Sequence, residues 1–183
     1  MASKRPLYVL AAACLAPFVA SFALFFLWKP DGGQMNYGTL LPVRAMPAAL
    51  KAAPGAADGT DVPLRGKWRL LIVDGPACDT RCRTKLYATR QARTMTGKER
   101  ERVERIWVLV GDGTPAPDLV AEHPDLRMAQ ADAALLTALP PDAAGAIFIV
   151  DPLGNLILRY PAAPDIRLLH KDLSRLLYAS RIG

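Results

Sequence analysis

The chain has 183 residues, of which 51% are hydrophobic and 22% are charged, and its formal net charge is +6. This length and composition fit one folded domain and exclude an intrinsically disordered protein or a collagen-like repeat. With only three cysteines, the chain is not a small secreted protein held together by many disulfides.

Residues 7–28 form a run of 22 residues without a charge, preceded by Lys4 and Arg5. A helix of about 20 apolar residues crosses a bilayer, whereas the apolar core of a secretory signal has about 7 to 15 residues. A cleaved signal peptide and a lipoprotein signal ending at Cys14 are the alternatives. No small-residue cleavage site follows the run, and the apolar residues continue well past Cys14. The sequence therefore predicts an uncleaved transmembrane helix in contact with membrane lipid.

The charges on either side of this run indicate its orientation. Residues 1–6 carry two basic side chains, whereas Lys29 on the other side is offset by Asp31. Because basic residues stay on the cytoplasmic side, we expect residues 1–6 in the cytoplasm and everything after residue 28 outside it. In a Gram-negative bacterium this describes a single-pass inner-membrane protein with a periplasmic carboxyl-terminal domain. Trp28 suits the membrane interface.

The next segment, residues 29–63, differs in composition from both of its neighbours. Residues 29–64 contain five prolines, five glycines and seven alanines, a composition typical of a tether or a loosely packed arm. Residues 36–42 (NYGTLLP) are its most ordered part, and we expect them to form an edge strand or an extended arm.

From residue 64 to residue 183 the pattern predicts an α/β domain. The expected strands are 68–74, 106–110, 126–129, 146–150 and 155–160, and the expected helices are 80–96, 132–139 and 165–180, with shorter helical pieces at 98–105 and 117–122. This order, a βαβ unit followed by a ββα unit, is that of the thioredoxin fold. Because such sheets bind ligands at the carboxyl ends of their parallel strands, chemistry is expected in the loop after the first strand.

That loop holds Cys78 and Cys82, spaced i and i+4. On a helix this spacing puts both side chains on one face, about 5 to 6 Å apart, which permits a disulfide after a small change or two thiolates for a soft ion such as Cu(I). The helix amino terminus and the basic residues Arg81, Arg83 and Lys85 favour thiolates, and Asp79 opposes them weakly. A plain structural disulfide is the alternative, although a bridge over one helical turn stabilises little.

Other cysteine and histidine sites do not match the sequence. A C-x-x-C redox motif, a C-x-x-C-H haem attachment and a four-ligand zinc site are missing. The chain has two histidines, and we expect His123 on the surface of a loop and His170 to cap or pack the closing helix.

Three features carry a resemblance to a known family: Gly66-Lys67-Trp68 before the first strand, the C-x-x-x-C pair, and the segment IFIVDPLGN at residues 147–155. Over residues 64–180 the chain resembles the SCO family of copper-binding, thioredoxin-fold assembly factors for cytochrome c oxidase. In that family two cysteines and a histidine shortly before the hairpin strand bind copper. Residues 142–145 of this chain read Asp-Ala-Ala-Gly, so it is a divergent member without that histidine.

The resemblance implies a role in oxidase assembly, with a respiratory oxidase subunit or an assembly factor as partner. Cys78 and Cys82 would act by thiol-disulfide exchange, with Cys78 attacking and Cys82 resolving, or would bind Cu(I) as metal ligands. The alternative is a binding module that holds an assembly partner and whose cysteines form a static disulfide.

The positive charge is concentrated in one stretch. Residues 65–105 contain twelve basic and five acidic residues, which indicates a solvated helix face, contact with anionic lipid or contact with an acidic partner. No motif that reads nucleic acid appears.

Overall fold

The computed structural model describes residues 4–27, 35–56 and 59–180. Its contacts divide the chain into two compact units, residues 1–35 and residues 36–183, and each unit is described by itself. Trp28, Lys29 and Asp31, on which the predicted interface residue and charge balance rest, lie outside the described residues.

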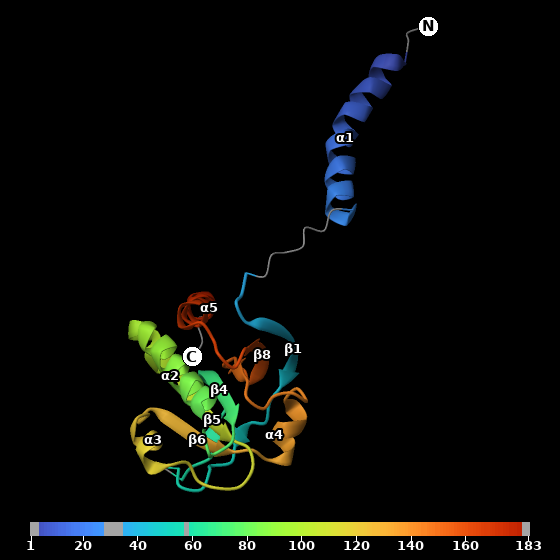
Figure 1. Cartoon of the computed structure of the whole chain (residues 1–183). Coiled ribbons are helices and arrows are strands. Elements are labelled where there is room, and N and C mark those ends of the chain that lie inside the picture. Colours follow the sequence, from blue (N-terminus) through green and yellow to red (C-terminus); the bar gives the residue numbers. More distant parts are fainter. Residues whose placement is uncertain (1–3, 28–34, 57–58, 181–183) are drawn as a thin grey trace. The chain divides into compact units, whose positions relative to one another are not determined.

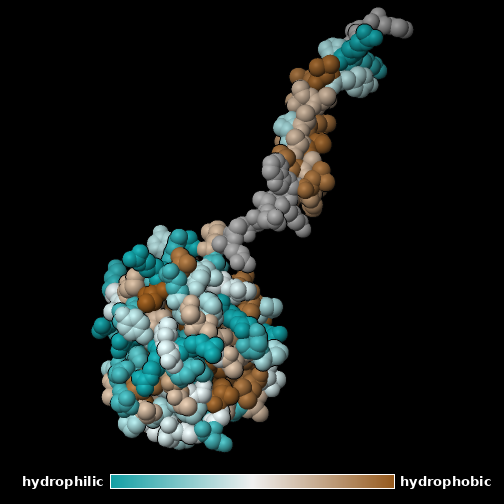
Figure 2. Space-filling model, in the orientation of Figure 1, coloured by the Kyte–Doolittle hydropathy of each residue, from teal (hydrophilic) through white to brown (hydrophobic). Residues whose placement is uncertain are grey.

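The first unit is a single helix, α1 (Arg5–Leu27), with Pro17 inside it. None of its side chains is buried in the protein, and apolar side chains make up most of its surface beyond the first turn (Figure 2). Its length and composition are sufficient for a membrane span, since 23 residues rise about 35 Å against a hydrocarbon core of about 30 Å. The helix therefore fits a single-pass membrane protein.

The second unit is built on a six-stranded sheet in the order β1-β8-β7-β4-β5-β6 (Figure 1). β4 and β5 are parallel, as are β5 and β6, whereas β7, β8 and β1 add antiparallel strands. The strands are β1 (Thr39–Ala45), β4 (Trp68–Asp74), β5 (Val103–Leu109), β6 (Leu126–Gln130), β7 (Ile147–Val150) and β8 (Asn155–Tyr160), and a separate ribbon joins β2 (Ala49–Leu50) to β3 (Val62–Pro63).

The helices of this unit are α2 (Thr80–Met95), α3 (Pro117–Ala121), α4 (Ala133–Ala138) and α5 (Ile166–Ala179), with a 3-10 helix η1 (Gly97–Arg102). Aspartates at residues 79, 132 and 165 cap α2, α4 and α5 by accepting backbone N–H groups of the first turn. The helical piece expected at 98–105 is wrong in its last three residues, because β5 begins at Val103 and pairs with β4 from its first residue.

Two hydrophobic clusters lie on the two faces of the sheet, because successive side chains of a strand alternate between faces. On one face Leu70, Ile72 and Trp107 pack with residues of α2 and α5; on the other, Leu71 and Val108 pack with α4 and the small ribbon. The central strands are buried on both faces, as the uninterrupted apolar runs in the sequence predict.

Part of the segment expected as a tether belongs to this domain. β1 pairs with β8 as an edge strand, which confirms one of the two forms expected for residues 36–42. Leu50 and Val62 are buried in the second cluster. The composition is misleading here because proline and glycine separate short strands. The compact unit thus starts at Asn36, ahead of the boundary at residue 64 that composition indicates.

Candidate redox site

The loop from β4 to α2 begins and ends with an aspartate. The Asp74 carboxylate accepts the N–H of Gly75 at 3.0 Å, and the N–H of Cys78 donates to the carbonyl of Gly75 at 3.4 Å. Asp79 then caps α2 by accepting the N–H of Cys82 at 2.9 Å, and this hydrogen bond is the main cause of its lowered pKa. The Asp79 carboxylate therefore serves as the amino-terminal cap of α2.

Cys78 and Cys82 form a disulfide, with their Cα atoms 5.0 Å apart. The two residues do not share a helix face as the spacing predicts, because Cys78 precedes the cap and has a positive φ of 35°. Cys82 is 0% exposed and Cys78 is 7% exposed, so both are buried and Cys78 is the less buried of the two. The structure brings the two predicted site residues together; their chemical roles stay a prediction.

A buried ion pair lies behind this loop. Lys85, one turn after Cys82 on the buried face of α2, is 1% exposed. Its ammonium forms an ion pair with Asp74 and donates to the carbonyl of Gly145 at 2.9 Å. The sequence places a cation near the cysteines, but it does not reveal that Asp74 and Gly145 hold it.

Gly145 belongs to a loop fixed against the end of β4. Its N–H donates to the carbonyl of Val73 at 2.8 Å, and the N–H of Val73 donates to the carbonyl of Ala146 at 3.1 Å. Its φ of 78° favours glycine, and a Cβ there would lie 3.7 Å from the Lys85 Nζ. This stretch, where the resemblance to the SCO family leads us to expect a metal-binding histidine, offers a backbone carbonyl to the Lys85 ammonium in this chain.

The donor set does not fit a copper site of three side chains. Among the described residues, no three or more His, Cys, Asp or Glu side chains are grouped so that they could hold a metal ion. His170 contacts Ser174 within α5, with Nε2 and Oγ 3.0 Å apart. The expectation for His123 is wrong: it is 3% exposed, and burial, together with Arg105 and Arg90, lowers its pKa to about 4.

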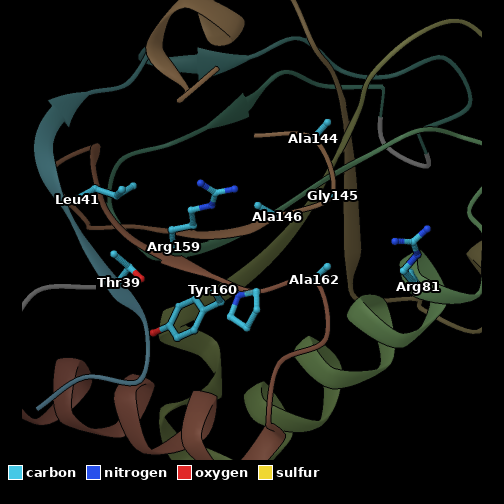
Figure 3. Close-up of a pocket in the computed structure, with 10 residues that line it drawn as sticks. Thr39, Leu41, Arg81, Ala144, Gly145, Ala146, Arg159, Tyr160 and Ala162 are labelled. Carbon is cyan, nitrogen blue, oxygen red and sulfur yellow. The ribbon is translucent and has the colours of Figure 1, made fainter. Parts of the chain in front are cut away.

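A cavity of about 510 Å³ opens at the same end of the sheet, lined by residues of β1, β8, the Gly145 loop and the first turn of α2 (Figure 3). Its charged lining residues are Arg81 and Arg159. Neither Arg159 nor the cavity was predicted from the sequence, because the cavity joins four segments that are far apart in the chain.

A disulfide in this position can exchange with thiols. The bond joins the loop to the first turn of α2, where the helix amino terminus and the exposed Arg81 favour thiolates once the bond is opened. Cys78 is the less buried of the two cysteines, so it is the better placed of the two for attack by another thiol.

Comparisons with known proteins agree with this fold. The family profile described as "Transmembrane-like, thioredoxin-like, C-terminal domain" matches residues 68–180. No curated protein matches the chain.

Solved structures share the fold at low sequence identity. The copper-bound ScoI of Bradyrhizobium japonicum is 20% identical, with a TM-score of 0.57, over 73% of this chain and 99% of that one. Yeast Sco1 with copper bound is 13% identical, with a TM-score of 0.59, over 76% and 91%. A putative protein disulfide isomerase from Bacteroides thetaiotaomicron is 15% identical, with a TM-score of 0.55, over 79% and 95%. The same fold thus occurs in copper-bound proteins and in a putative disulfide isomerase.

Proposed function

Because the chain belongs to the transmembrane-like, thioredoxin-like C-terminal domain family, we propose that it is a membrane-anchored protein that exchanges thiols and disulfides with a partner during the assembly of a respiratory oxidase. The domain lies outside the cytoplasm in this proposal, as the basic residues before α1 favour. Both features extend the resemblance to the SCO family.

The observation that carries the exchange function is the Cys78–Cys82 disulfide at the carboxyl end of β4. Extracytoplasmic compartments let such a bond persist. A bridge that closes a single helical turn removes little entropy from the unfolded chain, so stabilisation is a weak reason for it to be there. Its position at the end of a parallel strand is where α/β folds place their ligands.

The thiol-disulfide exchange needs no reactant other than the cysteine pair of this chain and the two thiols of the partner. A partner thiolate attacks the Cys78 sulfur, the Cys78–Cys82 bond breaks, and Cys82 leaves as a thiolate. A second partner thiolate then attacks the partner sulfur of the mixed disulfide and releases Cys78. The partner becomes a disulfide, and the pair gains the two electrons and two protons that the partner loses. In reverse, Cys78 attacks a partner disulfide and Cys82 resolves the mixed disulfide.

Cu(I) handling by the same two thiols is the second candidate. The reduced pair supplies two soft ligands, but the described residues offer no third side chain, and a lysine ammonium occupies the neighbouring loop. Exchange is therefore the function that the geometry supports best.

The exchange function is tested on the full chain in detergent. The pair is reduced with dithiothreitol, which is then removed, and the chain is equilibrated with glutathione buffers while free thiols are counted. We expect the wild type and Cys14→Ser, a control that removes the third cysteine, to titrate one disulfide reversibly. Cys78→Ser with Cys82→Ser should titrate none. A wild-type pair that fails to oxidise and reduce reversibly would overturn the proposal.

Two further measurements separate the alternatives. Anaerobic titration of the reduced chain with Cu(I) against a competing chelator should show no competition beyond that of a simple dithiol, and strong competition would favour the copper function. In cells of the source organism, the double serine variant should impair oxidase maturation. Normal maturation would favour the binding module with a static disulfide.

A further inference from the structure

The cavity that Arg81 helps to line is built from four segments of the chain. Thr39 and Leu41 of β1 line one side, Arg159 and Tyr160 of β8 continue it, and residues 144–146 and 161–162 and Arg81 complete it. Figure 3 shows Arg81 and Arg159 on opposite sides, with Gly145 and Ala146 between them. Its volume of about 510 Å³ is within the range of small-ligand sites.

The cavity and the disulfide belong to one end of the sheet. Arg81 lies in the first turn of α2, and in the sequence it stands between Cys78 and Cys82. Gly145, on the cavity wall, accepts the hydrogen bond of Lys85, whose ion-pair partner Asp74 starts the cysteine loop. The two cysteines do not line the cavity, but Arg81 links it to the helix turn that carries Cys82, so a chain segment in the cavity would lie at the end of the sheet that holds the disulfide.

The charged side chains that line the cavity indicate which kind of peptide segment would bind there. Arg159 is ion-paired with Asp142 and also donates to the Asp142 carbonyl at 2.9 Å, so its guanidinium is already engaged. Arg81 is different: its side chain is 82% exposed, and its ion pair with Asp79 spans 3.8 Å, while Asp79 already accepts the N–H of Cys82. Arg81 thus presents a cation with donors to spare at the cavity edge.

The rest of the lining suits an extended peptide. Most of the wall between the two arginines is made of small side chains and backbone, namely Ala144, Gly145, Ala146, Pro161 and Ala162. Small side chains leave room for a main chain to approach closely. An arginine beside such a wall recognises a carboxylate through its planar set of N–H donors.

We propose that this cavity binds the segment around the target cysteine of the partner and that Arg81 selects an acidic residue next to that cysteine. This inference rests on the proposed exchange function and names its substrate class, an acidic cysteine-bearing peptide.

The kinetic test compares two short peptide disulfides that differ only in having Asp or Asn next to the cysteine. The reduced full chain in a neutral detergent reacts with each, and each rate constant is divided by that of dithiothreitol with the same peptide. This ratio removes the intrinsic reactivity of the peptide. We expect the wild type to prefer the Asp peptide about 3- to 5-fold, as for an exposed ion pair.

Arg83 offers a matched control, because it is exposed on the same helix and does not line the cavity. Arg81→Gln should abolish the preference and Arg81→Glu should reverse it, whereas Arg83→Gln and Arg83→Glu should leave it unchanged. Equal effects at both positions would show a general charge effect and would overturn the assignment to Arg81.

A binding measurement tests the peptide preference of the cavity without relying on thiol-disulfide exchange. The same peptides with serine in place of cysteine are titrated into the oxidised chain by calorimetry. Tighter binding of the Asp peptide, lost in Arg81→Gln and kept in Arg83→Gln, is the expected result. Equal binding of the two peptides by the wild type would overturn the inference even if exchange proceeds. A binding preference without any exchange would support the inference and overturn the proposed function alone.

Discussion

Each end of the central sheet has a buried cation bound to a carboxylate and to a backbone carbonyl, and the two ends differ in what surrounds that cation. At the carboxyl end, Lys85 pairs with Asp74. At the amino end, Arg105 of β5 pairs with Asp125 at 3.0 Å and donates to the Leu86 carbonyl at 2.7 Å. The carboxyl end also has the disulfide and the cavity that Arg81 of α2 helps to line.

This difference shows that a buried charge alone does not identify a functional site. Burial lowers the pKa of Arg105 to about 10, so the guanidinium stays charged at neutral pH, and its hydrogen bonds tie β5 to α2. Lys85 has the same kind of partners, a carboxylate and a backbone carbonyl. Its partner Asp74, however, also accepts the N–H of Gly75, the first residue of the cysteine loop. The amino-end pair is therefore expected to act on stability alone, and the carboxyl-end pair on stability and reactivity.

The largest effect is expected from Arg105→Met. The substitution leaves the Leu86 carbonyl without its donor and leaves the partly buried Asp125 with Arg93 as its remaining partner. Removing one member of a buried pair costs about 3 to 5 kcal/mol. Chemical denaturation of the full chain should show this loss, while the exchange rate of the folded protein stays within about 2-fold of wild type, since local changes at distant sites act independently.

Arg90→Met serves as the control for this substitution, because Arg90, on α2, also donates to a backbone carbonyl, that of Glu122, but through an exposed hydrogen bond. It should cost about 1 kcal/mol or less. A large loss of exchange in Arg105→Met without loss of stability would break the comparison between the two ends.

Lys85→Met is expected to change both properties. Loss of the ammonium leaves Asp74 partly buried without its cation and should cost about 2 to 3 kcal/mol. It also removes a positive charge behind the cysteine loop, so alkylation of the reduced pair at neutral pH should slow by about 3- to 10-fold.

The double variant Asp74→Asn with Lys85→Met sharpens this result. It removes the unpaired carboxylate and should regain part of the stability, whereas alkylation should remain slow. Alkylation at the wild-type rate in Lys85→Met would assign the Lys85 pair to stability alone, like the pair at the amino end.

The smallest expected effect is the pH dependence of stability that His123 causes at the amino end of the sheet. His123 has an ordinary pKa of 6.5 that burial, Arg105 and Arg90 lower to about 4 in the folded chain. The unfolded chain therefore binds a proton more readily, so stability is full above pH 6.5 and is lost as the pH falls toward 4. Unfolding free energies should drop by about 1 to 2 kcal/mol between pH 7 and pH 5, and His123→Gln should flatten this dependence. An equally steep loss in His123→Gln would assign it to other groups.

Local sequence patterns were sufficient for the elements with strong local signals. The runs at 68–74 and 155–160 match β4 and β8 because uninterrupted or alternating apolar residues end at clear turn residues. Patterns failed where partners are distant. Lys85 contacts Asp74 and Gly145, 11 and 60 residues away in the chain, and hydropathy places lysine on the surface. His123 was misplaced for the same reason, since its burial depends on the packing of α2 and β5.

The pairing of β1 with β8 sets an order for folding. Thr39 lies opposite Arg159, so the first strand of the domain to leave the ribosome pairs with one that follows it by 120 residues (159 − 39). Contacts this distant in sequence form slowly because a long loop must close first. The edge of the sheet, and the cavity wall that β1 supplies, can be completed only after nearly the whole chain has been synthesised. A nascent or truncated chain therefore carries its cysteines before it has a complete place to receive a partner.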